Sequence, residues 1–122
     1  MVKIGVDTLE IVGYTDGQAV RTTGNLDDAL PEFLAGRNPN VGRLRPGSNN
    51  DLGLLRSLAV KKAWEEFVQQ QPQKEILAKV IVRSYSAGQT IPIGEGPKDD
   101  PEIYRRAEDS SRRIEIRLTK LK

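Results

Sequence analysis

Two residues of opposite charge, Asp16 and Arg56, are the side chains best suited to chemistry in this chain. Asp16 comes directly after an expected strand, and Arg56 lies one turn into an expected helix. A carboxylate at a strand end that faces a guanidinium at a helix start can hold a small zwitterion. The carboxylate takes the ligand's ammonium, while the guanidinium and the first helix amides take its carboxylate.

Both side chains also have an ordinary structural interpretation. Asp16 precedes Gly17, and an Asp in such a turn often accepts hydrogen bonds from nearby backbone amides. Arg56 could instead pair on the helix surface with Asp51 or with an exposed Glu. The residues alone leave these alternatives open.

The composition excludes several classes of function. A chain of 122 residues is expected to form one domain, and its net charge of +2 is too small to indicate a nucleic-acid partner. The sequence contains neither His nor Cys, which removes the usual general base, thiolate chemistry and the commonest metal ligands. We therefore expect no catalytic residues, no metal site, no cofactor and no enzymatic activity.

The sequence also bears on location. No apolar run approaches the length of a membrane span, and the amino-terminal residues do not resemble a signal peptide. We expect no membrane contact from this chain itself, so any export signal or anchor would lie on sequence outside it.

Four segments carry a clear secondary-structure pattern. Alternating apolar residues predict strands over 8–14 and 112–119, and an apolar run predicts an interior strand over 77–85. In the last strand, apolar side chains are expected to point inward and polar ones outward; the inward set is Ile114, Ile116 and Leu118, and the outward set is Arg113, Glu115, Arg117 and Thr119.

A helix is predicted over 51–71. Its apolar stripe comprises Leu52, Leu55, Ala59, Ala63 and Phe67, widened by Val60 and Trp64. Residues 49–51 are all of types that favour a helix amino terminus. Residues 17–48 are less regular, with a short helix expected between Asn25 and Gly36.

These elements predict an α/β (α+β) two-layer sandwich. Its core is a strand–helix–strand unit, in which a small mixed sheet of three strands is covered by helices on one face. We expect the whole chain, 1–122, to form a single domain in which 17–48 is an enlarged loop or insertion.

Four runs in this order resemble the OmpA-like, peptidoglycan-associating domain shared by OmpA carboxyl-terminal domains, the Pal lipoproteins and MotB. The runs are Leu9–Asp16, resembling a strand that ends in Gly-His-Thr-Asp; Asn49–Val60, resembling Asn-x-x-Leu-Ser-x-x-Arg-Ala-x-x-Val; Val82–Ser86 with Pro92; and Ser111–Ile116, resembling Asn-Arg-Arg-Val-Glu-Ile. The resemblance covers most of residues 8–118.

The resemblance implies a non-catalytic module that binds the diaminopimelate side chain of the peptidoglycan stem peptide. Asp16, in the Thr-Asp motif with Thr15, and Arg56 match the residues that hold this ligand. The other positions implied to form the site are Asn49 and Leu52, which shape the pocket, the backbone amides from Asn50 to Gly53, and Arg112 beside the pocket. The resemblance also implies a periplasmic location, within a longer envelope protein anchored to the cell wall.

The sequence departs from the family pattern in three ways. Tyr14, Gly53 and Ser111 replace the family's His, Ser and Asn, and the segment before Asn49 is longer by roughly twenty residues. The opening strand and helix of the family are shortened or missing, which predicts a sheet with part of one face uncovered. We therefore expect compensation by self-association into a homo-oligomer, or that the chain is a truncated piece of a longer protein. The alternative function is a protein-interaction or oligomerisation module on the same fold that has lost or altered wall binding.

Overall fold

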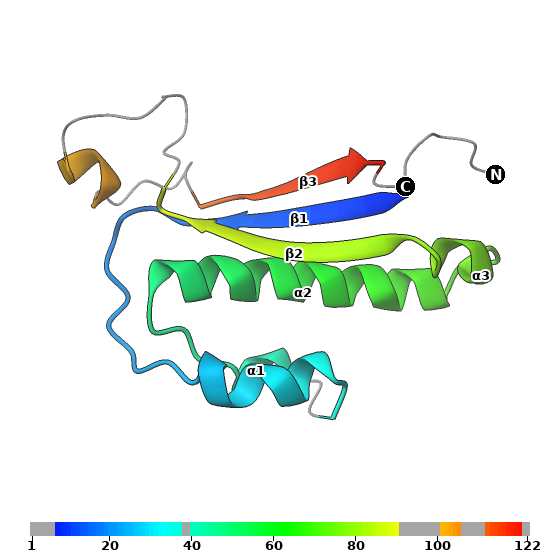
Figure 1. Ribbon diagram of the computed structural model, residues 1–122, viewed down its shortest axis with the longest axis horizontal. Coiled ribbons are helices and arrows are strands. Elements are labelled where there is room, and N and C mark those ends of the chain that lie inside the picture. Colours follow the sequence, from blue (N-terminus) through cyan, green and yellow to red (C-terminus); the bar gives the residue numbers. More distant parts are fainter. Residues whose placement is uncertain (1–6, 38–39, 91–100, 106–111, 121–122) are drawn as a thin grey trace.

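The computed structural model describes residues 7–37, 40–90, 101–105 and 112–120. Strands β1 (Thr8–Tyr14), β2 (Ile81–Gly88) and β3 (Ile114–Thr119) form one sheet in the order β2-β1-β3. β1 pairs parallel with β2 and antiparallel with β3. The predicted α+β fold is therefore confirmed: a three-stranded mixed sheet carries packed helices (Figure 1).

The long helix α2 (Asn49–Gln69) runs along the sheet, against β1 and β2. The shorter α1 (Leu26–Leu34) lies on the far side of α2, so α2 is held between the sheet and α1 (Figure 1). Three short elements complete the described structure: η1 (Val41–Arg43), α3 (Lys74–Leu77) and η2 (Pro101–Tyr104). The segment 17–48 thus adds a further helical layer to the fold.

Glycine on both partners brings α2 unusually close to β1. A Cβ on Gly13 would collide with the carbonyl oxygen of Gly53, and a Cβ on Gly53 would collide with the Ser86 side chain. Ser57, one turn further along α2, is fully buried, and its hydroxyl donates to the carbonyl of Leu54 at 2.8 Å. Small residues therefore set the distance between the helix and the sheet.

The predicted apolar stripe of α2 is only partly buried. Ala59 and Ala63 are exposed, and Phe67 is 50% exposed. Leu55 and its neighbour Leu58 are buried, in a core shared with Leu26 and Leu44 on the α1 side. The stripe is only partly covered because α2 has two packed sides, and the side that meets the sheet begins with the small residues Gly53 and Ser57, which hydropathy does not reveal.

The second strand begins later than predicted, and it is not interior. Residues 74–77 form α3, and β2 starts at Ile81. Among the strands that the structure describes, β1 is central and β2 lies at an edge. The apolar run did not indicate an interior position, because α2 covers one face of this strand and leaves residues such as Val82 half-buried without a second neighbouring strand in the described part of the chain.

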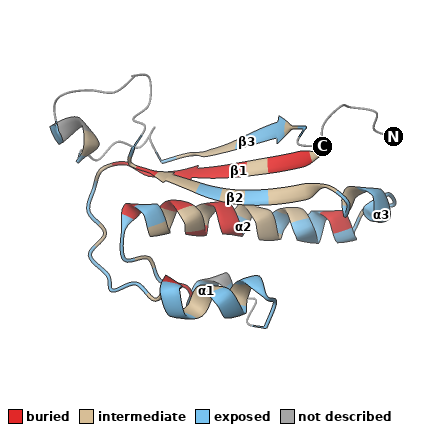
Figure 2. Cartoon of the chain, in the orientation of Figure 1, coloured by how far each residue is buried: buried red, intermediate tan, exposed pale blue. Residues whose placement is uncertain are grey.

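The last strand has the predicted alternation but not the predicted burial. Ile116 pairs with Ile11, and Leu118 pairs with Leu9, so the apolar residues of β3 share the sheet face that α2 covers. Nevertheless Ile116 is 57% exposed and Leu118 is 62% exposed. The prediction that both point into a core was wrong because α2 packs on β1 and β2, leaving the end of β3 exposed (Figure 2).

Candidate functional site

The candidate site is assembled where β1 ends and α2 begins. Ser48 is the residue that caps α2: its hydroxyl accepts the Asp51 amide at 3.1 Å, while the Asp51 carboxylate accepts the Gly47 amide at 2.8 Å. These reciprocal bonds satisfy amides that a helix start otherwise leaves unpaired. Residues 49–51, which were predicted as caps, instead form the first turn of the helix.

Asp16 is buried at the carboxyl end of β1, with 7% of its surface exposed. Its Oδ2 accepts a hydrogen bond from Arg112 Nε at 2.8 Å, and its Oδ1 accepts one from the Gln18 amide at 3.1 Å. The structure therefore brings together two predicted site residues that are 96 positions apart in the sequence. It also contains the local turn bond of the alternative interpretation, so the carboxylate is oriented from two directions.

Arg56 reaches the same end of β1 from the first turns of α2. Its Nη1 donates to the carbonyl oxygen of Tyr14 at 3.1 Å, two residues before Asp16. A guanidinium has five N–H donors, and this bond uses one of them. The side chain is therefore attached to the strand end without exhausting its capacity to bind an anion.

Asn49 contributes a buried acceptor to this region. Its Nδ2 donates to the Gln18 carbonyl at 3.2 Å, so Asn49 and Asp16 are both bonded to the backbone of Gln18. Its Oδ1 is buried and has no hydrogen-bond partner in the described structure. A buried acceptor without a partner costs on the order of 1–3 kcal/mol.

The remaining predicted site residues mainly support this arrangement. Thr15 is buried, donating its hydroxyl to the Asp16 carbonyl at 2.9 Å and its amide to Gly88 at 2.8 Å. The Leu52 amide is bonded to the Ser48 carbonyl at 3.0 Å, and Gly53 packs against β1. Asn50 is exposed at the helix start. Their ligand-binding roles stay predictions.

A polar cluster around Tyr14 was not predicted. On the sheet face opposite α2, the Tyr14 hydroxyl donates to Glu115 Oε2 at 2.8 Å and accepts from Arg117 Nη2 at 3.2 Å. The Arg113 guanidinium carbon lies 3.8 Å from the centre of the Tyr14 ring. The alternating charges of the last strand signal such a face, but they do not identify the aromatic residue beneath it.

This cluster changes two proton affinities in opposite directions. Burial, followed by the hydrogen bond to Glu115, raises the pKa of Tyr14 above its ordinary value of 10.0. The hydrogen bond from Tyr14, followed by the one from Arg117, lowers the pKa of Glu115 below its ordinary value of 4.5. At neutral pH the cluster therefore holds a protonated phenol and an ionised carboxylate.

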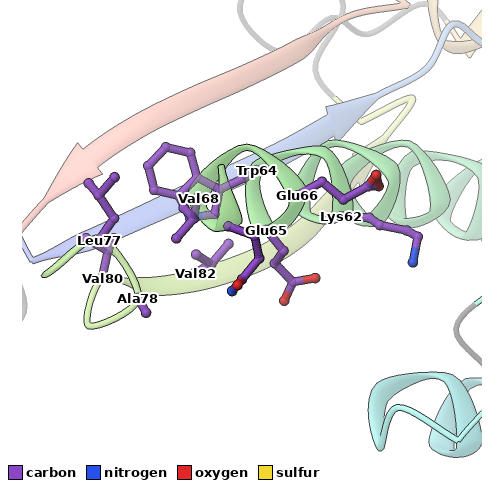
Figure 3. Close-up of a pocket in the computed structure, with 10 residues that line it drawn as sticks. Lys62, Trp64, Glu65, Glu66, Val68, Leu77, Ala78, Val80 and Val82 are labelled. Carbon is purple, nitrogen blue, oxygen red and sulfur yellow. The ribbon is translucent and has the colours of Figure 1, made fainter. Parts of the chain in front are cut away.

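A groove of about 470 Å³ lies at the other end of α2 (Figure 3). Apolar side chains from α2, from the segment leading into β2 and from the start of β2 line it, including Trp64, Val68 and Val82, together with charged residues such as Glu65. The Trp64 and Phe67 ring centres are 5.8 Å apart. None of the lining residues belongs to the predicted site.

Two kinds of feature are absent from the residues that the structure describes. Among these residues, no helix combines the length and apolar character that crossing a membrane requires. Within the same ranges, no three or more His, Cys, Asp or Glu side chains come together as metal ligands. The described polar arrangement at the end of β1 is thus built from Asp, Arg and Asn side chains together with backbone groups.

The site geometry described above consists of contacts within this chain. The resemblance to the OmpA-like domain comes from the four sequence runs. Comparison of the chain with models of known protein families, with curated proteins and with solved structures finds no match.

Proposed function

We propose that this chain is a non-catalytic module that binds the diaminopimelate-type stem peptide of peptidoglycan and anchors a membrane protein to the cell wall. In this proposal it works in the periplasm, as part of a longer envelope protein. The observation that carries the proposal is the convergence of Asp16, Arg56 and Arg112 at one end of β1, from three of the four runs that resemble the family.

The acidic side of the site suits an ammonium group. The buried Asp16 carboxylate, oriented by bonds from Arg112 and Gln18, supplies the negative charge that an ammonium group requires. Asn49 adds a buried acceptor, its Oδ1 atom, and its Nδ2 atom donates to the carbonyl of Gln18. The diaminopimelate side chain ends in an amino and a carboxyl group, and its ammonium would bind these oxygens.

The basic side of the site suits the carboxylate of the same ligand. Arg56 lies at the start of α2, where the helix dipole also favours a negative charge. Each charge-assisted hydrogen bond contributes on the order of 1.5–3 kcal/mol. A few such bonds, less the entropy lost on association, give affinities in the micromolar to millimolar range. Repeated contacts along a polymer make that range sufficient for anchoring.

The test is a titration with a diaminopimelate-containing stem peptide, followed by amide chemical shifts. We expect shifts at Asp16 and at residues 49–56, and we expect Asp16→Asn or Arg56→Ala to weaken binding about tenfold or more. Matched controls are Asp27→Asn and Arg83→Ala, which remove exposed charges on α1 and β2. Unchanged binding by Asp16→Asn would end the proposal.

A second ligand separates the two halves of the site. A stem peptide with lysine in place of diaminopimelate keeps the side-chain ammonium but lacks the adjacent carboxylate. We expect the normal chain to prefer diaminopimelate, and Arg56→Ala to lose that preference. If both peptides bind equally to the normal chain, Arg56 does not hold the carboxylate.

The alternative function, a protein-interaction or oligomerisation module, is favoured by one observation. Ile116 and Leu118 are exposed on the sheet face that α2 covers elsewhere. Deleting the insertion would not test this idea cleanly, because Leu26 of α1 packs against Leu55 and Leu58 of α2. Substitutions on β3, designed below, test it without removing that core.

A further inference from the structure

We propose that two copies of this chain associate edge to edge through β3, antiparallel, about a two-fold axis at Ile116. In the part of the chain that the structure describes, the strand order β2-β1-β3 places β3 at an edge of the sheet. Pairing of two such edges would join two three-stranded sheets into one. The inference is independent of stem-peptide binding, since it uses neither Asp16 nor Arg56.

The alternating direction of the backbone N–H and C=O groups along β3 shows which residues offer hydrogen bonds at this edge. The Tyr14 amide donates to the Arg113 carbonyl at 2.8 Å, so Arg113 directs its peptide groups toward β1. In an antiparallel pair this direction alternates from residue to residue. Glu115 and Arg117 therefore also face β1, while three residues direct their N–H and C=O groups outward: Ile114, Ile116 and Leu118.

Several registers would pair the outward N–H and C=O groups of two β3 strands. The charges of Glu115 and Arg117 favour one of these registers. With Ile116 opposite Ile116 of the second copy, Glu115 lies opposite Arg117 of the second copy, twice by symmetry. A shift to the neighbouring registers places Glu115 opposite Glu115, or Arg117 opposite Arg117. Directly opposed unlike charges stabilise a strand pair, and like charges destabilise it.

The apolar side of β3 agrees with the same register. Ile116 would meet Ile116, and Ile114 would meet Leu118 of the second copy, on the face where Ile116 and Leu118 are exposed. Charges on edge strands commonly oppose unwanted pairing. In β3 the two charges are of opposite sign and two positions apart, so they oppose the shifted registers and favour the centred one.

Analytical ultracentrifugation from about 1 µM to 1 mM, the span in which weak specific complexes form, tests the association. We expect a monomer–dimer equilibrium for the normal chain. Arg117→Glu places Glu opposite Glu and is expected to raise the dimer dissociation constant about tenfold or more. Arg83→Glu, the same change on the exposed surface of β2, is the matched control and is expected to leave dimerisation unchanged.

Charge reversal provides a rescue that a misfolded variant cannot show. Arg117→Glu alone and Glu115→Arg alone should each dimerise poorly, whereas a one-to-one mixture should form heterodimers because every opposed pair is again unlike. Failure of the mixture to associate, a monomer at every concentration of the normal chain, or equal effects of Arg117→Glu and Arg83→Glu would each overturn the proposal.

Disulfide formation tests the register directly, since the natural sequence has no cysteine. Ile116→Cys places two thiols opposite each other, at a Cα separation near 5.5 Å that suits a disulfide. Leu118→Cys, equally exposed, faces Ile114 of the second copy instead. We expect Ile116→Cys dimers to cross-link about tenfold faster or more, and equal rates would contradict the two-fold axis at Ile116.

Discussion

The two strands that flank β1 differ in how well they are covered. Leu9 of β1 has Val82 of β2 on one side and Leu118 of β3 on the other, all on the same sheet face. Val82 is half-buried beside α2, whereas Leu118 is exposed. Side-chain type does not explain the difference, because both residues are aliphatic. What differs is the element packed above them.

Connectivity explains why the cover is uneven. α2 links two parallel neighbours, β1 and β2, and such a crossover lays its helix over the strands that it joins. β3 enters the sheet from a different part of the chain and pairs with β1 from the other side. The apolar residues of β3 lie on the sheet face that α2 covers, but α2 itself packs on β1 and β2.

Filling the narrow space between α2 and β1 should cause the largest loss of stability. Gly13→Ala introduces a Cβ that collides with the Gly53 backbone, and backbone cannot move aside as a flexible side chain can. We expect the free energy of unfolding to fall by about 4 kcal/mol or more, measured by urea denaturation. Gly42→Ala is the control, because its nearest contact is the Asn40 side chain. Similar losses for both variants would contradict this close packing.

The covered and exposed positions can be compared within one cross-strand pair. Ile11 and Ile116 lie opposite each other, but Ile11 is 0% exposed. Ile11→Ala should cost about 2–5 kcal/mol of unfolding free energy. Ile116→Ala should cost less than about 1 kcal/mol in the free energy of unfolding of the monomer. An equal loss at both positions would show that β3 is covered after all.

Removing the cap at the start of α2 should lower the free energy of unfolding by a smaller amount. Ser48→Ala removes the hydroxyl that accepts the Asp51 amide, with an expected loss of about 1 kcal/mol in the free energy of unfolding. Ser48→Asp restores an acceptor at the cap and should recover most of that stability. If the alanine and aspartate variants are equally stable, the cap does not hold this end of the helix.

The smallest effect is expected from pH at the polar face of β3. The pKa of Glu115 is lowered in the fold, so its stabilising contribution is complete above about pH 4.5 and is lost as the pH falls through the folded-state pKa. The effect should be small because the Glu115 side chain is 38% exposed. The raised pKa of Tyr14 predicts a separate loss as the pH rises above 10.

Urea denaturation between pH 3 and pH 6, a range chosen to span carboxylate titration, measures the acid side of this effect. Glu115→Gln should show a smaller decrease in stability than the normal chain. Glu75→Gln, on the exposed surface of α3, is the matched control. A decrease that is identical in Glu115→Gln and the normal chain would show that Glu115 is not coupled to the fold.

Part of the candidate site was accessible from the sequence. The run ending in Asp16 and the run containing Arg56 could be singled out because local patterns place them at a strand end and a helix start. The ion pair between Asp16 and Arg112 could not be derived in this way, because its partners lie 96 residues apart. The unpaired Asn49 Oδ1 atom was equally hidden, since burial of a helix-start side chain depends on the loop that passes over it.

The sequence by itself determined which side chains share a face. The bounds of β1 and the alternation of β3 follow from a period of two residues, which is a local property of extended backbone. Only the tertiary structure decided what covers each face. It placed Gly53 and Ser57 of α2 against the sheet and turned Leu55 toward α1, and it left Leu118 exposed. Periodicity orders neighbours along one element, whereas burial depends on where segments distant in the chain come to lie.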